Sequence, residues 1–225
     1  MSVTGAPKTG PETVFATLSE TLSETMENRA TALPPPWRSR RAFPDAVGRF
    51  RESLEAAHGE AIVAGTVGEA LAEAGRQLRE IGAKCVVANT EAPLEMLLPE
   101  RGAGWQVERA GDHAAGPERW RELCAGADAG VTSAETLLAE TGSLVVRSGP
   151  GRSRLVSLLP PVHIAIVPIG RMTSDLFTWL ESRSGPWPAN TVLISGPSKT
   201  GDIEQTLSVG VHGPKRLVVV LYNED

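Results

Sequence analysis

The chain has 225 residues, which suits one α/β domain with or without appendages. Hydrophobic residues make up 41% of it, enough for a sizeable core. The formal net charge is −5 at pH 7 and the basic residues are scattered, so nothing points to a nucleic-acid partner. No segment has the length and apolar character of a transmembrane helix, and the first ten residues lack the apolar core of a secretory signal. We therefore expect a cytoplasmic protein.

The cysteines and histidines give no sign of a metal centre. Cys85 and Cys124 are far apart, lack metal-ligand spacing and have apolar neighbours, which predicts buried free thiols in a reducing compartment. Two cysteines cannot hold an iron–sulfur cluster by themselves. The four histidines are scattered. We expect neither a metal nor another cofactor in this chain.

Residues 1–43 are predicted to form an arm that is separate from the main domain. Residues 12–29 have apolar side chains at four-residue spacing, which predicts an amphipathic helix. Three consecutive prolines at 34–36 form a stiff linker, and the small polar residues at the start predict partial disorder. The helix could dock on its own domain or on a partner. Residues 44–225 form the expected α/β domain.

Helical and strand patterns alternate between residues 44 and 131. In the segment 66–81, Thr66 and Glu69 have the spacing of a capping box ahead of an apolar stripe. The segment 84–88 is a short apolar run, typical of a strand buried on both faces. This alternation predicts an open, mostly parallel sheet flanked by helices. The expected helices are 44–58, 66–81, 93–98 and 117–125, and the expected strands are 60–64, 84–88, 105–109 and 127–131.

The pattern changes after residue 132. Residues 143–147 alternate like a strand and precede a tight Gly-Pro-Gly loop, so we expect residues 135–161 to form a small antiparallel excursion. Residues 162–167 then form another buried strand. Residues 174–184 are expected to be a helix with Leu176, Phe177 and Leu180 facing inward.

Residues 190–221 are predicted to form a β-α-β unit. The run Thr191–Ile194 predicts a strand, Asp202 is a good N-cap for a following helix, and residues 217–221 form a second apolar strand. A crossover of this kind implies that the two strands are parallel. The turn after the first strand would then lie at a strand's carboxyl end, where ligands bind in open α/β folds.

That turn, residues 195–202, is the strongest candidate for a binding site. A glycine-containing loop before a helix offers free N–H groups to an anion, and a lysine adds a full charge. The alternative is a plain connecting turn with a solvated lysine. The candidate ligand-binding residues here are Ser195, Gly196, Ser198, Lys199, Thr200, Asp202 and Glu204.

Two further polar clusters interrupt apolar segments. Glu140, together with Glu135, could take part in acid/base chemistry, although two surface glutamates are the commoner interpretation. The adjacent Thr141 and Gly142 are further candidate ligand-binding residues. His163 interrupts a run that should be buried, where a lone histidine is more often a hydrogen-bonded core residue than a catalyst. A further candidate is His212, which follows the predicted helix.

Four sequence blocks resemble a known family. They are Ala139-Glu140-Thr141-Gly142-Ser143-Leu144, Leu158-Leu159-Pro160-Pro161-Val162-His163-Ile164, the segment from Ile194 to Glu204, and Gly210-Val211-His212-Gly213-Pro214. Their order and content are similar to the LUD domain and, within it, to the lactate utilization protein C family.

The resemblance implies a fold like those of ribose-5-phosphate isomerase and the CoA transferases. It also implies a role in bacterial oxidation of L-lactate to pyruvate, alongside two partner proteins that carry iron–sulfur clusters. This chain resembles the cluster-free member. The resemblance supplies no catalytic residues, so Glu140, His163 and His212 remain candidates from their chemistry alone.

Three functions follow as hypotheses. The chain could be a non-redox subunit of a lactate-oxidising complex that binds a small carboxylate or another anion in the 195–202 loop. It could instead be an independent enzyme acting on a phosphosugar, a folate or a CoA thioester, by fold analogy. It could also be a purely structural subunit.

Overall fold

The computed structural model describes residues 42–97, 104–111, 116–200, 208–209 and 212–224. The predicted N-terminal helix and proline linker lie outside these residues, as do Asp202 and Glu204.

Six parallel strands in the described part of the chain form the main sheet, in the order β1-β12-β7-β4-β2-β3. This confirms the predicted open parallel sheet. From β2 the chain moves outward to β3, whereas from β4 it moves the other way, to β7. The strands are β1 (Glu60–Ala64), β2 (Cys85–Ala88), β3 (Gln106–Arg109), β4 (Ala129–Thr132), β7 (Val162–Pro168) and β12 (Arg216–Tyr222).

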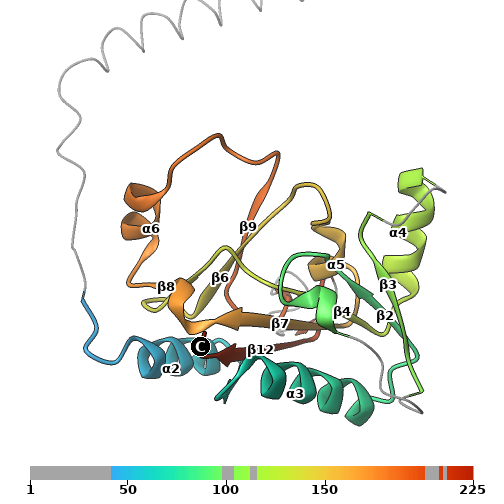
Figure 1. Cartoon of the computed structure of the whole chain (residues 1–225), viewed down its shortest axis with the longest axis horizontal. Coiled ribbons are helices and arrows are strands. Elements are labelled where there is room, and N and C mark those ends of the chain that lie inside the picture. Colours follow the sequence, from blue (N-terminus) through green and yellow to red (C-terminus); the bar gives the residue numbers. More distant parts are fainter. Residues whose placement is uncertain (1–41, 98–103, 112–115, 201–207, 210–211, 225) are drawn as a thin grey trace, which may run out of the picture. The chain divides into compact units, whose positions relative to one another are not determined.

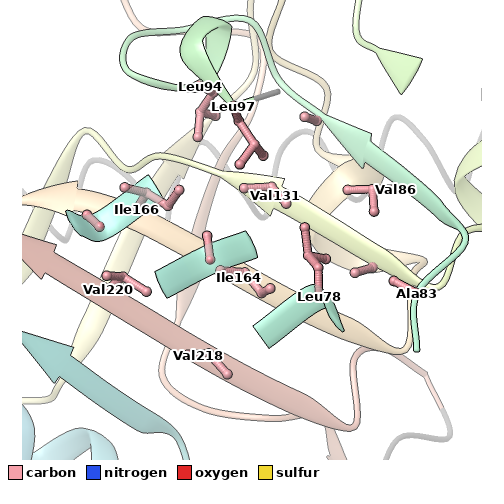
Figure 2. Close-up of a cluster of buried hydrophobic side chains, with 14 of the residues drawn as sticks. Leu78, Ala83, Val86, Leu94, Leu97, Val131, Ile164, Ile166, Val218 and Val220 are labelled. Atoms are coloured by element: carbon pink, nitrogen blue, oxygen red, sulfur yellow. The ribbon is translucent and has the colours of Figure 1, made fainter. Parts of the chain in front are cut away.

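The central strands are apolar on both faces because both faces are covered. In β12, Val218 and Val220 join one cluster, whereas Leu217, Val219 and Leu221 join another on the opposite face. Figure 2 shows part of the first cluster, in which Val86, Val131 and Ile164 of the sheet lie beside Leu78 of a helix.

Helix α3 (Val67–Glu80) covers this first face. Its apolar stripe includes Ala70, Ala74 and Leu78, all fully buried. Thr66 caps the helix as predicted, since its hydroxyl accepts from the backbone N–H of Glu69 at 3.2 Å. The short 3-10 helix η1 (Leu94–Met96) contributes Leu94 to the same cluster.

Several elements share the opposite face. Helix α2 (Ala46–Ala56) buries Phe50 and Leu54 there. Helix α4 (Gly116–Gly126) adds Trp120 and Cys124, and the single-turn helix α5 (Leu155–Leu158) lies against β4. In Figure 1, α3 and α5 lie on opposite sides of the sheet.

A second, smaller sheet also lies on this face, in the order β8-β5-β6-β9. The antiparallel pairing of β5 with β6 confirms the predicted excursion. The sheet also takes in two strands from later in the chain. Its strands are β5 (Thr136–Leu138), β6 (Ser143–Arg147), β8 (Met172–Thr173) and β9 (Thr191–Ile194), and the 3-10 helix η2 (Ile169–Arg171) leads into β8.

The predicted β-α-β unit at 190–221 is wrong. Strand β9 pairs antiparallel with β6 in the small sheet, whereas β12 lies in the main sheet. Strand β11 (Ser208–Val209) falls where the helix was expected and pairs antiparallel with β10 (Lys199–Thr200). A four-residue apolar run predicts a strand but does not specify the sheet that receives it.

Helix α6 (Leu176–Ser182) also differs from its prediction. Trp179 is its buried residue, whereas Phe177 and Leu180 are exposed. Asp175 is its N-cap, and its side chain accepts from the N–H of Thr178 at 2.7 Å. No helix within the described ranges is long and apolar enough to cross a membrane.

Candidate functional site

The structure brings several of the predicted site residues together around one small cavity. This amino-edge cavity, of about 210 Å³, is lined by His163, Ser195, Gly196, Ser198 and His212 among others. His163 is the second residue of β7, so the cavity lies at the amino ends of the parallel strands. The sequence prediction placed the 195–202 loop at a carboxyl end. That prediction fails because β9 belongs to the other sheet.

His163 is buried and hydrogen-bonded, as predicted. Its side chain is 1% exposed, and its Nε2 lies 2.8 Å from the hydroxyl oxygen of Thr132. Burial lowers the pKa of the imidazole to about 4, so the ring is neutral at pH 7. Its Nδ1 has no hydrogen-bond partner among the described residues. A buried, neutral and hydrogen-bonded ring is more typical of a histidine in the core than of one that binds a ligand through its charge.

Thr141 lies close to the loop through a chain of hydroxyl groups. Its Oγ1 is 2.7 Å from Oγ of Ser143, which is in turn 2.7 Å from Oγ of Ser195. This chain can supply hydrogen bonds but no charge. It joins the turn before β6 to the end of β9.

Gly142 and Glu140 have structural contacts. Gly142 has a φ of +63°, and a Cβ there would lie 2.3 Å from the backbone nitrogen of Leu54, so only glycine lets this turn reach α2. The backbone carbonyl of Glu140 accepts from the hydroxyl of Ser53 at 3.1 Å and from Arg49 at 3.3 Å. Both residues fasten the small sheet to α2.

Lys199 also contacts α2. Its Nζ donates to the carbonyl oxygen of Ala57 at 2.8 Å and lies 2.8 Å from Nδ1 of His58. Ala57 is the C-cap of α2, where unpaired carbonyls and the negative end of the helix dipole attract a cation. In this structure Lys199 therefore stabilises a helix end. The side chain of Thr200 lies outside the described part.

We expect Lys199→Ala to lower the free energy of unfolding by about 0.3–1 kcal/mol, the usual contribution of a cation near a helix C-terminus. Urea unfolding measures this change. Lys215→Ala is the matched control, because Lys215 is also exposed and its side chain makes no hydrogen bond or ion pair with the described residues. Equal losses in the two variants would show that Lys199 does not cap α2.

A larger and more highly charged cavity lies elsewhere in the fold. This arginine cavity, of about 290 Å³, is lined by Arg147, Arg152 and Arg171, by Glu91 and Glu135, and by Ser133 and Ala134 among others. Glu91 follows β2, Ser133 follows β4 and Arg171 follows β7. The cavity therefore lies at the carboxyl ends of the parallel strands.

Arg171 is held in place by neighbouring acceptors. Its Nη1 donates to the carbonyl oxygen of Ala134 at 2.8 Å and to the hydroxyl of Ser133 at 3.2 Å. Within the described ranges, its Nε and Nη2 have no hydrogen-bond partner. These two nitrogens remain available as donors.

Glu91 forms an ion pair with Arg152 in the lining of this cavity. Its Oε1 accepts from the backbone N–H of Ser133 at 3.1 Å, and its Oε2 lies 3.5 Å from Nε of Arg152. The loop that carries Arg152 is fastened here, since Thr90 donates its N–H to the carbonyl of Gly151 at 2.9 Å. Burial raises the pKa of the Glu91 carboxyl above its ordinary value, although Ser133 and Arg152 oppose the shift.

Glu135 is an ion-pair partner and not a solvated surface residue. Its Oε2 lies 3.0 Å from Nε of Arg147, and its Oε1 lies 3.8 Å from Nε of Arg183. The side chain of Glu135 is 19% exposed. Glu140 is not among the residues that line this cavity, and its backbone carbonyl contacts α2. An acid/base role for the two glutamates stays a prediction.

This cavity could not be recognised from local sequence patterns, because its residues come from five separate segments of the chain. One pattern in the sequence could have indicated the cavity: polar residues follow soon after buried strands, as Glu91 and Ser133 do. Parallel strands bring their carboxyl ends to one edge of a sheet. The chain departs in opposite directions after β2 and after β4, and ligands bind at such a switch point.

The two cysteines pack in one apolar cluster. Cys124 is buried, whereas Cys85 is only partly buried, so the prediction for Cys85 was too strong. Burial raises the pKa of the Cys124 thiol to about 12 and also raises that of Cys85. Thiolates are the ligands of metals and clusters, so these thiols are poorly suited to that role. No group of potential metal ligands is found in the described part of the sequence.

Comparisons with known proteins agree with the fold. The model of the LUD domain family matches residues 47–222. A crystal structure of a DUF162 family protein from Deinococcus radiodurans has the same fold, with a TM-score of 0.55 and 19% identity over 79% of this chain and 96% of that one.

Curated relatives match a shorter stretch. Lactate utilization protein C of an Exiguobacterium species is 44% identical over 114 residues, which are 48% of this chain and 50% of the relative. That of Bacillus subtilis is 40% identical over 104 residues, covering 44% and 43% of the two chains. An uncharacterized protein of Neisseria meningitidis is 38% identical over 107 residues, or 46% of each. The matched stretch thus spans about half the length of these relatives. Because the family model covers most of the chain, this protein belongs to the LUD domain family.

Proposed function

We propose that this chain is the cluster-free subunit of a bacterial system that oxidises L-lactate to pyruvate. The observation that carries the proposal is its similarity to several proteins named lactate utilization protein C, at about 40% identity. In this proposal two partner proteins hold the iron–sulfur clusters and transfer the electrons. The chain itself binds a small carboxylate or another small anion.

The environment of the thiols supports the non-redox part of the proposal. Cys124 is fully buried and remains protonated at neutral pH because its pKa is about 12. A buried thiol that stays protonated at neutral pH makes a poor nucleophile. Electron transfer is therefore assigned to the partners.

The sequence predicts that the anion binds in the 195–202 loop, with Lys199 as the charged contact. Two features of the structure disfavour that location. An anion there would have to compete with the carbonyl of Ala57 for Nζ of Lys199. It would also approach a cavity whose described lining is largely neutral.

One observation favours a second function, an independent enzyme. The arginine cavity lies at the edge of the sheet where open α/β enzymes bind substrates. A phosphosugar, a folate or a CoA thioester would each bring an anionic group to it. This alternative requires turnover by the isolated chain, whereas the subunit proposal requires partners.

Co-purification tests the subunit proposal. The tagged chain is expressed together with the two iron–sulfur partner proteins that the proposal requires and is captured under mild salt. We expect both partners to be retained in fixed ratio, with iron in the eluate, while the tag alone retains neither. A chain that elutes by itself from cells containing both partners would contradict the proposal.

A further inference from the structure

We propose that the arginine cavity is a binding site for a small hydroxycarboxylate, a molecule with one carboxylate and one neighbouring hydroxyl group. The inference rests on the proposed function only in choosing L-lactate as the probe. The class of ligand follows from the donors and acceptors that line the cavity.

The donors fit a carboxylate. Arg171 is fixed through Nη1 by Ala134 and Ser133, which leaves its Nε and Nη2 as a planar pair of donors. A guanidinium edge matches the two oxygens of a carboxylate and binds them through two parallel hydrogen bonds. Because its position is already set by backbone and hydroxyl acceptors, little side-chain entropy is lost when a ligand binds.

Two more arginines contribute positive charge to the lining. Arg147 and Arg152 are about one-third exposed, so a ligand can reach them from solvent. Each meets a glutamate through its Nε, Arg147 at 3.0 Å and Arg152 at 3.5 Å. The 3.5 Å contact is long for a charge-assisted hydrogen bond, so Arg152 can turn towards a ligand at small cost.

The acceptors select against a highly charged ligand. Glu91 and Glu135 place carboxylate oxygens in the same lining, which therefore contains three guanidinium groups and two carboxylates. Arg183 adds a positive charge behind Glu135. A second negative charge on the ligand would face these oxygens, whereas a ligand hydroxyl could donate to one of them. A hydroxycarboxylate satisfies both kinds of group, and a phosphate offers mainly acceptors.

The size and position of the cavity agree with this class. Its volume of about 290 Å³ lies at the lower end of the range for small-molecule sites. It opens between the segments that follow β2 and β4, the two strands after which the chain departs in opposite directions.

Titration calorimetry of the purified chain tests the site with L-lactate, propionate and inorganic phosphate. We expect L-lactate to bind most tightly, and propionate to bind about threefold to tenfold more weakly because it lacks the hydroxyl. Arg152→Gln should weaken L-lactate binding by roughly 10- to 100-fold, the effect of losing one charge-assisted contact. Arg154→Gln is the matched control, since Arg154 is exposed two residues away and lies outside the lining.

Several results would overturn the inference. These are an unchanged affinity in Arg152→Gln, tighter binding of phosphate than of L-lactate, or no binding of any probe. Loss of L-lactate binding in Lys199→Ala but not in Arg152→Gln would place the ligand in the 195–202 loop instead. If Arg152→Gln does not fold, as judged by circular dichroism, Arg147→Gln serves as the second variant. Partner capture without lactate binding would contradict this site and leave the assignment as a subunit of the complex standing. Lactate binding without partner capture would support the site and contradict that assignment.

Discussion

Lowering the pH from 7 to 4 should reduce the free energy of unfolding by about 3 kcal/mol through His163 alone. The pKa of the buried imidazole is lowered from 6.5 to about 4, because burial disfavours the charged form. Between these values the unfolded chain binds a proton at this histidine and the folded chain does not. Protonation therefore stabilises the unfolded state as the pH falls. The stability that the neutral His163 provides is fully present above pH 6.5 and is lost as the pH falls towards 4.

Urea unfolding at pH 7, 5.5 and 4 measures this effect against a variant. His163→Gln keeps an amide near Thr132 but cannot titrate, so its stability should depend less on pH than that of the wild type. His212→Gln is the control, because His212 is exposed beside the same cavity. Parallel curves for the wild type and His163→Gln would show that the imidazole is not a buried neutral group.

Gly130→Ala should destabilise the protein by about 3 kcal/mol or more, at the upper end of the cost of overpacking a core. Gly130 lies in β4, between β2 and β7, and pairs with Val87 and His163. A Cβ at this position would lie 1.8 Å from the carbonyl oxygen of Val156 in α5. The obstacle is backbone, so no side-chain rotation relieves it. Helix α5 would have to move away from the sheet.

The matched control is Gly126→Ala. Gly126 ends α4, and a Cβ there would have no atom within 4 Å. The free energy of unfolding of Gly126→Ala should remain within about 0.5 kcal/mol of the wild-type value, or rise slightly because alanine makes the unfolded chain less flexible. Thermal and urea unfolding measure both variants. Gly130→Ala with wild-type stability would mean that α5 does not pack directly on β4.

Much of the main sheet could be predicted because its strands are short, continuous apolar runs. The run at 162–167 and the strand Ser143–Arg147 both lie where the sequence placed them. The failure at Thr191–Ile194 has a physical cause. Its side chains are only partly buried and Leu193 is 46% exposed, as suits the edge strand of a smaller sheet. The local pattern of the run does not distinguish the two locations.

The two cavities differ in how much of their lining could be predicted from the sequence. Ser195 and Ser198 lie in one loop, and His212 follows it in the sequence, so their proximity could be predicted. The sequence treats His163 as a separate candidate, and the structure places it in the same cavity. The arginine cavity depends on long-range pairing. Glu91 and Arg152 meet only because the loop after β6 is fastened to the segment after β2. No local spacing encodes that contact.

The role of Lys199 shows a related limit. A lysine in a polar turn looks available for a ligand when only its neighbours in sequence are known. Its partner, the carbonyl of Ala57, lies 142 residues earlier in the chain. The same cation that would attract an anion instead interacts with the negative end of α2. Its function as a ligand contact remains a prediction that the binding experiments decide.

Reconstitution of lactate oxidation from purified proteins tests whether this chain is needed for the reaction. The two iron–sulfur partner proteins are mixed with and without this chain, and L-lactate-dependent reduction of a dye is followed spectroscopically. We expect the rate of dye reduction to fall to background when the chain is omitted and to return when the chain is added back. Addition of Arg154→Gln should restore the rate as the wild type does, and Arg152→Gln should not. A full rate in the absence of the chain would contradict its assignment to lactate oxidation.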